Sequence, residues 1–282
     1  MKNFIKLKTE QILKRWGLYK KSPFQVYHLS RSDDYFTHIE FPKYGRTWLR
    51  YMVCQAIASK YQLPLKNMIF DICYPNLSLP RLYFVHGMRP EKNFQEYSYK
   101  PFLNKVRRPK GVIFQIRHPE RVMESYYYQC LFRQKNTEIN DNFKKFLRDP
   151  NFGIKKYAEY IDYYIPKIKE TKHLIIKYEN MVKNPEKILK TVLDFIEINL
   201  EEKEIKKIVQ NSTKEKMREI EKNKVYNIGW LKPAQKNNFN SYKIRTLDKG
   251  SASELLDKED KKFIKEICRE CQHLKKYYPD LA

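Results

Sequence analysis

The sequence predicts an open α/β fold, in which a parallel sheet is covered by helices. Short apolar stretches alternate along the chain with segments whose apolar residues recur at helical spacing, which is the order of elements in α/β proteins. The stretch at residues 111–117, GVIFQIR, is almost continuously apolar, as expected of a parallel strand that is buried on both faces.

The individual elements follow from the same patterns. The expected strands are residues 35–41, 82–85, 111–117 and 173–178. The expected helices cover residues 48–61, begin at Pro119 and at Pro185, and cover residues 258–277. Proline is tolerated in the first turn of a helix, where its missing N–H breaks no hydrogen bond.

The chain of 282 residues, 1–282, is interpreted as a single domain. A basic lead-in helix is expected over residues 1–30, and a long loop that faces a cofactor or substrate over residues 222–256. Further substrate loops, rich in Tyr, Asn and Lys, are expected within residues 61–80, 88–108 and 130–155.

Composition excludes several classes of protein. Apolar residues make up 41% of the chain, which is enough for a core, and no apolar run approaches the roughly 18 residues of a membrane span. The N-terminus lacks the apolar core of a signal peptide, and five cysteines without regular spacing argue against a disulfide scaffold. These features predict a cytoplasmic protein.

The charge is strongly basic, with 57 Lys and Arg against 33 Asp and Glu, a formal net charge of +24. Such a surface favours polyanions such as nucleic acid, anionic lipid or a phosphate- or sulfate-bearing ligand. A dispersed, lysine-rich surface that serves solubility alone is an equal interpretation, so charge does not select a function.

Candidate ligand-binding residues stand at the predicted strand ends, because ligands of open parallel sheets bind beyond the carboxyl ends of the strands. These ends carry the loop at residues 43–47, then His86, Arg117 and Tyr178. A loop that leads into a helix offers backbone N–H groups to an anion. A Walker A loop has its lysine after the glycines, whereas Lys43 precedes the loop's glycine, so an ordinary P-loop ATPase or kinase is disfavoured.

Four segments together resemble the sulfotransferase family. Residues 41–49, FPKYGRTWL, resemble its 5′-phosphosulfate loop, and residues 117–127, RHPERVMESYY, resemble its 3′-phosphate segment. Residues 80–86, PRLYFVH, resemble the stretch that ends in its catalytic histidine, and residues 178–181, YENM, resemble its Y-E-D-L. The matches occur in the family's order over roughly residues 35–256, and they imply the sulfotransferase version of the P-loop nucleotide-binding fold, an open parallel sheet flanked by helices.

The sequence departs from the family's pattern at several positions. Tyr44 replaces the common Ser, Phe84 a common Lys, and Arg121 a common Asp. Residues 245–250, RTLDKG, match the C-terminal R-K-G-x-x-G only in part, and the nearby Trp is replaced by Ala252. We expect Arg245 still to reach the 3′-phosphate, with Lys243 or Lys249 as a supplement.

The resemblance implies transfer of a sulfuryl group from 3′-phosphoadenosine 5′-phosphosulfate (PAPS) to a hydroxyl, or an amine, of a small molecule, lipid or glycan. The spent donor is adenosine 3′,5′-bisphosphate (PAP). His86 is the expected base and Lys43 the expected cation at the bridging oxygen. The expected donor-binding residues are Lys43, Tyr44, Gly45, Arg46, Thr47, Trp48, Arg117, Ser125, Tyr178 and Arg245.

No metal is expected in this chemistry. Cys268, Cys271 and His273 near the C-terminus lack a second cysteine pair, so helix-face cysteines are the favoured interpretation. Two other functions stay open: a nucleotide-dependent phosphotransferase on the same fold, which needs Mg²⁺, and a basic protein without catalysis that binds nucleic acid or another polyanion. Nucleic acid is not expected as a partner of the sulfotransferase, and the basic N-terminus offers a peripheral membrane contact as an alternative to packing on the body.

Overall fold

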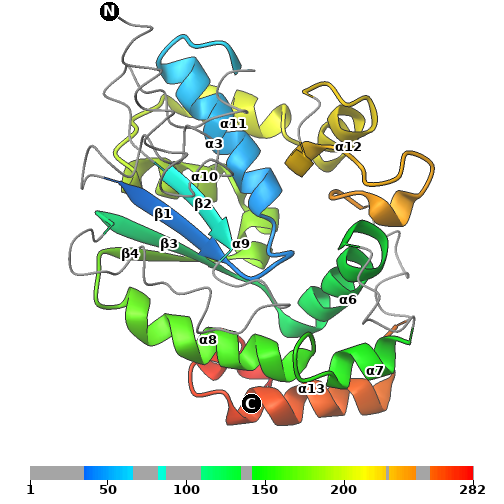
Figure 1. Cartoon of the computed structure of the whole chain (residues 1–282). Helices are drawn as coiled ribbons and strands as arrows, with labels where there is room; N and C mark the ends of the chain where they lie inside the picture. The colour runs from blue at the N-terminus through cyan, green and yellow to red at the C-terminus, as the bar shows by residue number, and fades with distance from the viewer. Residues whose placement is uncertain are drawn as a thin grey trace, which may run out of the picture.

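The centre of the fold is a four-stranded parallel sheet. A computed structural model of the chain describes residues 35–65, 82–86, 109–134, 142–226, 229–245 and 255–281. The strands are β1 (Phe36–Glu40), β2 (Leu82–His86), β3 (Gly111–Ile116) and β4 (His173–Lys177), in the order β2-β1-β3-β4 (Figure 1). All neighbouring pairs are parallel, so the carboxyl ends of the strands meet at one edge of the sheet.

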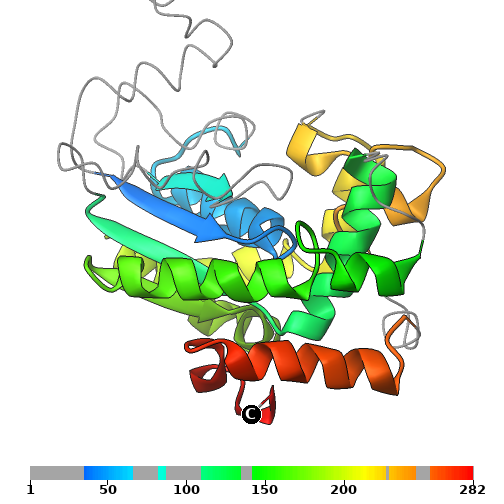
Figure 2. The ribbon, with the colours of Figure 1, turned by 60° about the horizontal axis from the view of Figure 1, so that its bottom comes forward.

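Helices cover both faces of the sheet. The α-helices are α3 (Arg46–Lys60), α6 (Pro119–Gln129), α7 (Phe143–Arg148), α8 (Ile154–Ile168), α9 (Tyr178–Lys183), α10 (Pro185–Phe195), α11 (Glu202–Gln210), α12 (Lys214–Lys222) and α13 (Lys258–Glu270). A π-helical turn, η2 (Cys130–Gln134), continues α6, and short 3₁₀ turns cover η3 (Gly229–Leu231), η4 (Phe239–Ser241), η5 (Leu274–Lys276) and η6 (Pro279–Leu281). Helices α3, α10 and α11 lie on one side of the sheet, and α8 and α13 on the other (Figures 1 and 2).

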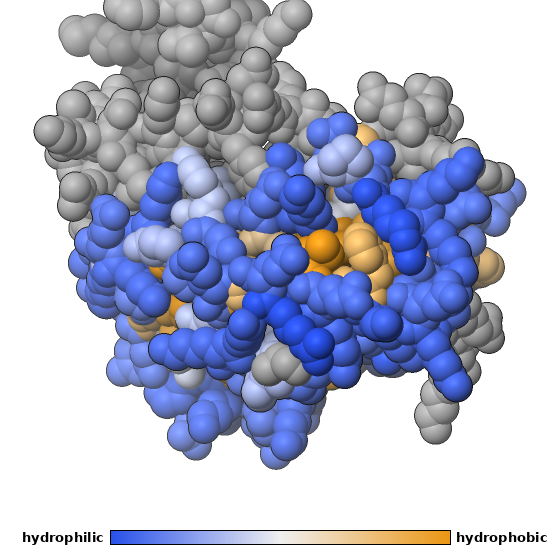
Figure 3. Space-filling model, turned by 90° about the horizontal axis from the view of Figure 1, so that it is seen from below, coloured by the Kyte–Doolittle hydropathy of each residue, from blue (hydrophilic) through white to orange (hydrophobic). Residues whose placement is uncertain are grey.

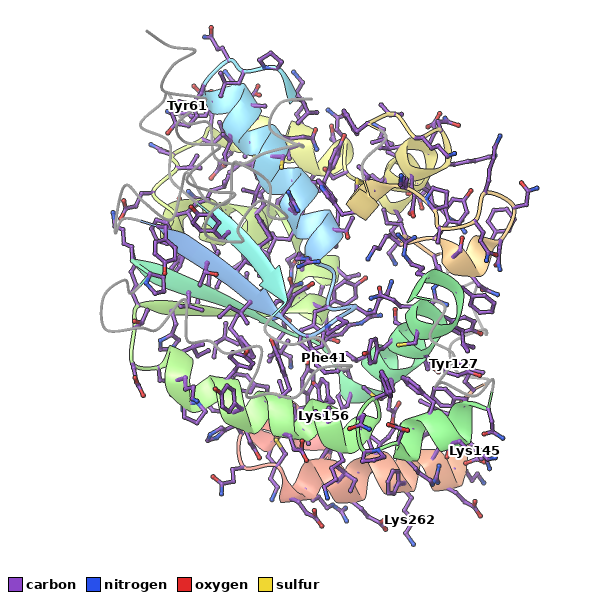
Figure 4. All side chains as sticks on the ribbon, in the orientation of Figure 1. Phe41, Tyr61, Tyr127, Lys145, Lys156 and Lys262 are labelled. Atoms are coloured by element: carbon purple, nitrogen blue, oxygen red, sulfur yellow. The ribbon has the colours of Figure 1, made fainter. Side chains whose placement is uncertain are left out.

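Two apolar clusters fill the space between these layers. Alternate residues of β3 supply both clusters, because side chains of a strand point to opposite faces: Val112 and Phe114 face α8, and Ile113 faces α3. Phe41, just after β1, makes ring contacts with Tyr157 and Tyr160 of α8 (Figure 4). The predicted fold class, an open parallel sheet flanked by helices, is confirmed.

The C-terminal helix closes the lower face. Helix α13 packs on α8 through a face that includes Ile264 and Cys268, and its lysines, among them Lys262, point outward (Figures 2 and 4). The surface seen from this side is accordingly mostly hydrophilic (Figure 3). An open hollow there is lined by basic side chains of α13 together with His118 and the carboxylates of Glu120, Glu266 and Asp280. In the described ranges, no helix combines the length and the apolar character that a bilayer crossing needs.

Some expected boundaries were wrong. Residues 130–155, predicted as a substrate loop, contain η2 and α7, because Asn142 caps the helix with its side chain and Phe143, Phe146 and Leu147 are buried. The helix expected over residues 258–277 ends at Glu270, where the chain turns extended at Cys271. Helices α8, α11 and α12 are absent from the predictions above. The lead-in helix over residues 1–30, most of the first two substrate loops, and Lys249 with Ala252 lie outside the described residues.

Candidate functional site

The backbone of the loop between β1 and α3 adopts left-handed conformations at two positions, which restricts the residues that the loop can contain. Lys43 and Gly45 both have positive φ, 75° and 100°. A Cβ on Gly45 would lie 2.6 Å from the Tyr178 ring, so glycine is needed both for its conformation and for this close approach. Helix α3 begins directly afterwards at Arg46, which directs the positive end of its dipole toward the loop.

Side chains from the end of β3 fix the loop through its carbonyls. Gln115 donates from Nε2 to the Tyr44 carbonyl at 2.7 Å, and Arg117 donates from Nη1 to the Lys43 carbonyl at 2.7 Å. The Arg117 guanidinium also lies 4.3 Å from the centre of the Tyr178 ring, on the other side of the same loop. The carbonyls of residues 43 and 44 are therefore bound to the neighbouring strand, and the loop has a defined shape without a ligand.

A buried ion pair braces the other end of the loop. Both oxygens of Glu40, 2% exposed, meet Arg46: Oε2 accepts from the backbone N–H at 3.0 Å, and Oε1 lies 3.2 Å from Nε. Burial raises the pKa of Glu40 to about 7, although Arg46 opposes that shift. The guanidinium of Arg46, expected to bind the donor, is thus engaged with Glu40 in this structure.

Tyr44 and Tyr178, both predicted to bind the donor, pack their rings against the loop or the core beneath it. Tyr44 is fully buried, in ring contact with Phe41 and Tyr157, so its side chain belongs to the core and cannot bind a ligand. A contact of Tyr44 with the donor stays a prediction, and it is one for the backbone of this residue. Tyr178 lies between Gly45 and Arg117 and shapes the loop from the start of α9.

Cations from distant segments gather around Lys43. Its Nζ donates to the carbonyl of Lys243 at 3.4 Å. The pKa of Lys43 is well below its usual range, first because of burial and then because of Lys243, Arg245 and other cations nearby. Burial also lowers the pKa of Lys243 to about 7 and that of Arg245 to about 10. Crowding of this kind favours binding of an anion, which relieves the mutual repulsion.

The expected 3′-phosphate residues meet on α6. Arg245 Nη2 lies 3.4 Å from Ser125 Oγ, and its guanidinium stacks 4.1 Å from the centre of the Tyr128 ring. The structure therefore brings together Ser125 and Arg245, which are 120 residues apart in the sequence. Arg117 is close enough to Arg245 to lower its pKa, but its hydrogen bond in this structure goes to the loop carbonyl.

The first turn of α3 carries the remaining expected donor residues. Trp48 donates from Nε1 to the Ser212 carbonyl at 2.7 Å, and Gln55 donates to the Ser212 hydroxyl at 2.7 Å. These bonds attach α3 to the connection between α11 and α12. Thr47 is partly exposed in the same turn, beside the loop.

The expected base stands at the same edge of the sheet. His86 is the last residue of β2, and its Cα is in register with Glu40 at the end of β1. This pairing places the backbone of His86 at the carboxyl end of the sheet, beside Glu40, which precedes Lys43 by three residues.

Sequence reasoning missed three polar residues of this site. Glu221 of α12 is fully buried and accepts the backbone N–H groups of Lys243 and Ile244 at 2.7 and 3.0 Å. Arg133 of η2 lies with its Nη1 3.6 Å from Glu221 Oε1, and Gln129 Oε1 lies 3.5 Å from Lys243 Nζ. A carboxylate on an otherwise charged helix gives no signal in the sequence, because burial is decided by the distant segment that covers it.

The described part of the chain holds no group of three or more His, Cys, Asp or Glu side chains that suits a metal ion. Cys268 and Cys271 are buried free thiols, and burial raises the pKa of Cys271 to about 12. The Cys271 thiol contacts Asp162 of α8, which explains it as part of the packing of α13.

Three comparisons place the chain among known proteins. The model of the sulfotransferase domain family matches residues 39–277. The crystal structure of mouse sulfotransferase SULT7A1 complexed with PAP is similar, with a TM-score of 0.59 and 17% identity, over 89% of this chain and 93% of that chain.

Retinol dehydratase in complex with androsterone and inactive cofactor PAP has a TM-score of 0.59 and 14% identity, over 88% of this chain and 83% of that chain. Its complex with retinol and PAP gives a TM-score of 0.58 at 14% identity, with 88% and 84% covered. At these identities the structures show a shared fold. Among the curated proteins no sequence matches.

Proposed function

We propose that this chain, which belongs to the sulfotransferase domain family, transfers a sulfuryl group from PAPS to a hydroxyl group of an acceptor. The observation that carries the proposal is the cluster of cations around the loop after β1. Its members are Lys43, Arg46, Arg117, Arg133, Lys243 and Arg245. In the described ranges, their ion pairs are those of Arg46 with Glu40 and of Arg133 with Glu221, which leaves an excess of four basic side chains that can balance the charge of a bound anion.

A PAPS molecule matches this excess. Its 3′-phosphate carries about two negative charges near neutral pH, and its 5′-phosphate and sulfate carry about one each. Separate positions for the two ends are available, since Arg245 meets Ser125 of α6 while Lys43 lies in the loop. PAP is also what the similar structures of SULT7A1 and retinol dehydratase contain.

The chemistry assigned to the chain's residues is a direct displacement at sulfur. The acceptor oxygen forms a bond to sulfur while the bond between sulfur and the bridging phosphate oxygen breaks, and PAP leaves with that electron pair. His86 takes the proton of the acceptor hydroxyl, and Lys43 stabilises the negative charge that develops on the bridging oxygen. The loop and the first turn of α3, including Thr47, hold the 5′ end in line with the acceptor.

The acceptor is proposed to be a hydroxyl-bearing small molecule, lipid or glycan. The proteins of known structure include one bound to androsterone and to retinol, both small molecules. The charge balance supports an acceptor without a large negative charge of its own, because the donor alone offsets the excess of cations.

The test is thermal stabilisation by three ligands at equal concentration: PAP, ADP with Mg²⁺, and an oligonucleotide. A ligand that binds the native state raises the melting temperature in proportion to its affinity. We expect PAP to stabilise the protein most, with no dependence on Mg²⁺. Stabilisation by ADP that requires Mg²⁺, or by the oligonucleotide alone, overturns the proposal in favour of a phosphotransferase or a polyanion-binding protein.

A further inference from the structure

The segment of residues 241–245 follows one face of α6 and η2 through three successive contacts. Arg133 donates to the Ser241 carbonyl, Lys243 Nζ lies 3.5 Å from Gln129 Oε1, and Arg245 Nη2 lies 3.4 Å from Ser125 Oγ. The contacts advance by two residues in the segment and by four in the helix. The contacts with Gln129 and Ser125, four residues apart in the helix, place the side chains of Lys243 and Arg245 on the same face of α6, about one helical turn apart.

In the middle contact of this series, between Lys243 and Gln129, the partner of the lysine carries no negative charge. Gln129 offers Lys243 a neutral oxygen, and Lys243 forms no ion pair with a carboxylate in the described part of the chain. Glu221 is nearby, but its two oxygens accept the backbone N–H groups of Lys243 and Ile244, and its charge faces Arg133. The ammonium of Lys243 is therefore partly buried and has a neutral amide oxygen, that of Gln129, as its acceptor.

Lys243, the middle residue of the series, is the one that contacts the loop. Its own carbonyl accepts the hydrogen bond of Lys43 Nζ at 3.4 Å, which places the Lys43 ammonium beside the backbone of Lys243. Arg245 and Ser125 form the contact at one end of the series, the position proposed for the 3′-phosphate. A donor that spans the site therefore presents its 5′ end, with the sulfate, on the side of Lys43 and Lys243.

We propose that Lys243 is a further donor-binding residue, whose ammonium contacts the sulfate of PAPS beside Lys43. This inference rests on the proposed function, and it assigns the sulfate to a residue that lies 200 residues away from Lys43 in the sequence. An anionic group on the acceptor offers the same chemistry. The charge excess favours the donor, because PAPS alone offsets it.

The first test compares binding of PAPS and PAP, which differ by the sulfate. We expect Lys243→Met to weaken PAPS binding about tenfold or more, while PAP binding changes by less than about threefold, as measured by isothermal titration without acceptor. Lys243→Arg keeps the charge and should restore most of the PAPS affinity. Lys236→Met is the matched control, because Lys236 is exposed on the same segment of the chain.

Each other outcome has a distinct meaning. Equal weakening of PAPS and PAP overturns the assignment to the sulfate, and unchanged binding of both with a raised KM for the acceptor assigns Lys243 to the acceptor instead. If the wild-type protein binds neither nucleotide, the proposed function itself fails. A melting temperature of Lys243→Met close to that of wild type shows that the variant is folded.

A pH series gives a second readout that a purely structural lysine would not move. The charged groups that face Lys243 are Arg133, Arg46, Glu40 and Glu221, from four elements, and Lys43 of the loop after β1. The pKa of the free lysine is about 7, mainly because of burial, and a bound anion raises it. PAPS binding then takes up a proton above about pH 7, so affinity falls as pH rises from 7 to 9. Lys243→Met should flatten this slope by up to one proton, and an unchanged slope contradicts the proposal.

Discussion

Two regions form the candidate site, and they are built in opposite ways. The loop of residues 41–46 is one contiguous stretch, whose shape depends on backbone conformation and on donors from β3. The segment of residues 241–245 leaves the 3₁₀ turn η4 at Ser241, bends at residues 243 and 244, and is held by side chains of α6, η2 and α12. The loop is a local motif, whereas the position of residues 241–245 depends on contacts with side chains that are distant in the sequence. The two regions should therefore respond differently to substitution.

The largest effect is expected in the loop and its partner strand. Lys43→Ala and His86→Ala should each lower kcat by about 10²–10⁴-fold, because a positioned cation and a positioned base both act in the transition state. Steady-state assays at saturating PAPS measure this, with Lys236→Met as the control for an exposed lysine. Near-normal turnover of His86→Ala would remove it as the base.

A smaller effect is expected from the support of residues 241–245. Glu221→Gln removes the charge and one of the two acceptors that hold the backbone N–H groups of Lys243 and Ile244. Leaving a buried donor without an acceptor costs about 1–3 kcal/mol, so the free energy of unfolding in urea should fall by that amount. If stability stays at the wild-type value while Glu221 is replaced, the segment is held by its contacts with α6 instead.

The smallest effect is expected at Ser125, a single neutral donor. Ser125→Ala should weaken PAP binding by about 1 kcal/mol, or roughly fivefold, and leave a 5′-phosphosulfate without the 3′-phosphate unaffected. Titration of both ligands checks the difference. Equal losses for the two would place Ser125 away from the 3′-phosphate.

The same contrast explains which parts of the site the sequence predicts. Lys43 and Gly45 are adjacent in a stretch between a strand and a helix, so their pattern is visible without a structure. Arg133 fell in a segment predicted as a loop, and Glu221 in a helix that was not predicted, because their meaning arises where residues 241–245 cover them.

Arg117 shows how a correct placement can still miss a role. As expected, it follows β3, but its guanidinium holds the Lys43 carbonyl, so it supports the loop as well as facing Arg245. Arg117→Ala should therefore disturb both ends of the donor, and it is a poorer probe of the 3′-phosphate than Ser125. The strand ends were predictable from hydrophobic runs, whereas the direction of a long side chain is set by packing.

The π-helical turn at the end of α6 sets the pitch at which these contacts repeat. An α-helix has 3.6 residues per turn, so every fourth residue drifts steadily around its axis. The wider winding of a π-helix, with its i→i+5 hydrogen bonds, counters that drift across Cys130–Gln134. Arg133 thereby stays on the same side of the helix as Gln129 and Ser125, and all three contact residues 241–245. Deleting one residue of this turn would restore ordinary α-helical winding and rotate Arg133 away from the Ser241 carbonyl. That contact would then be lost, while the contact between Ser125 and Arg245 would remain.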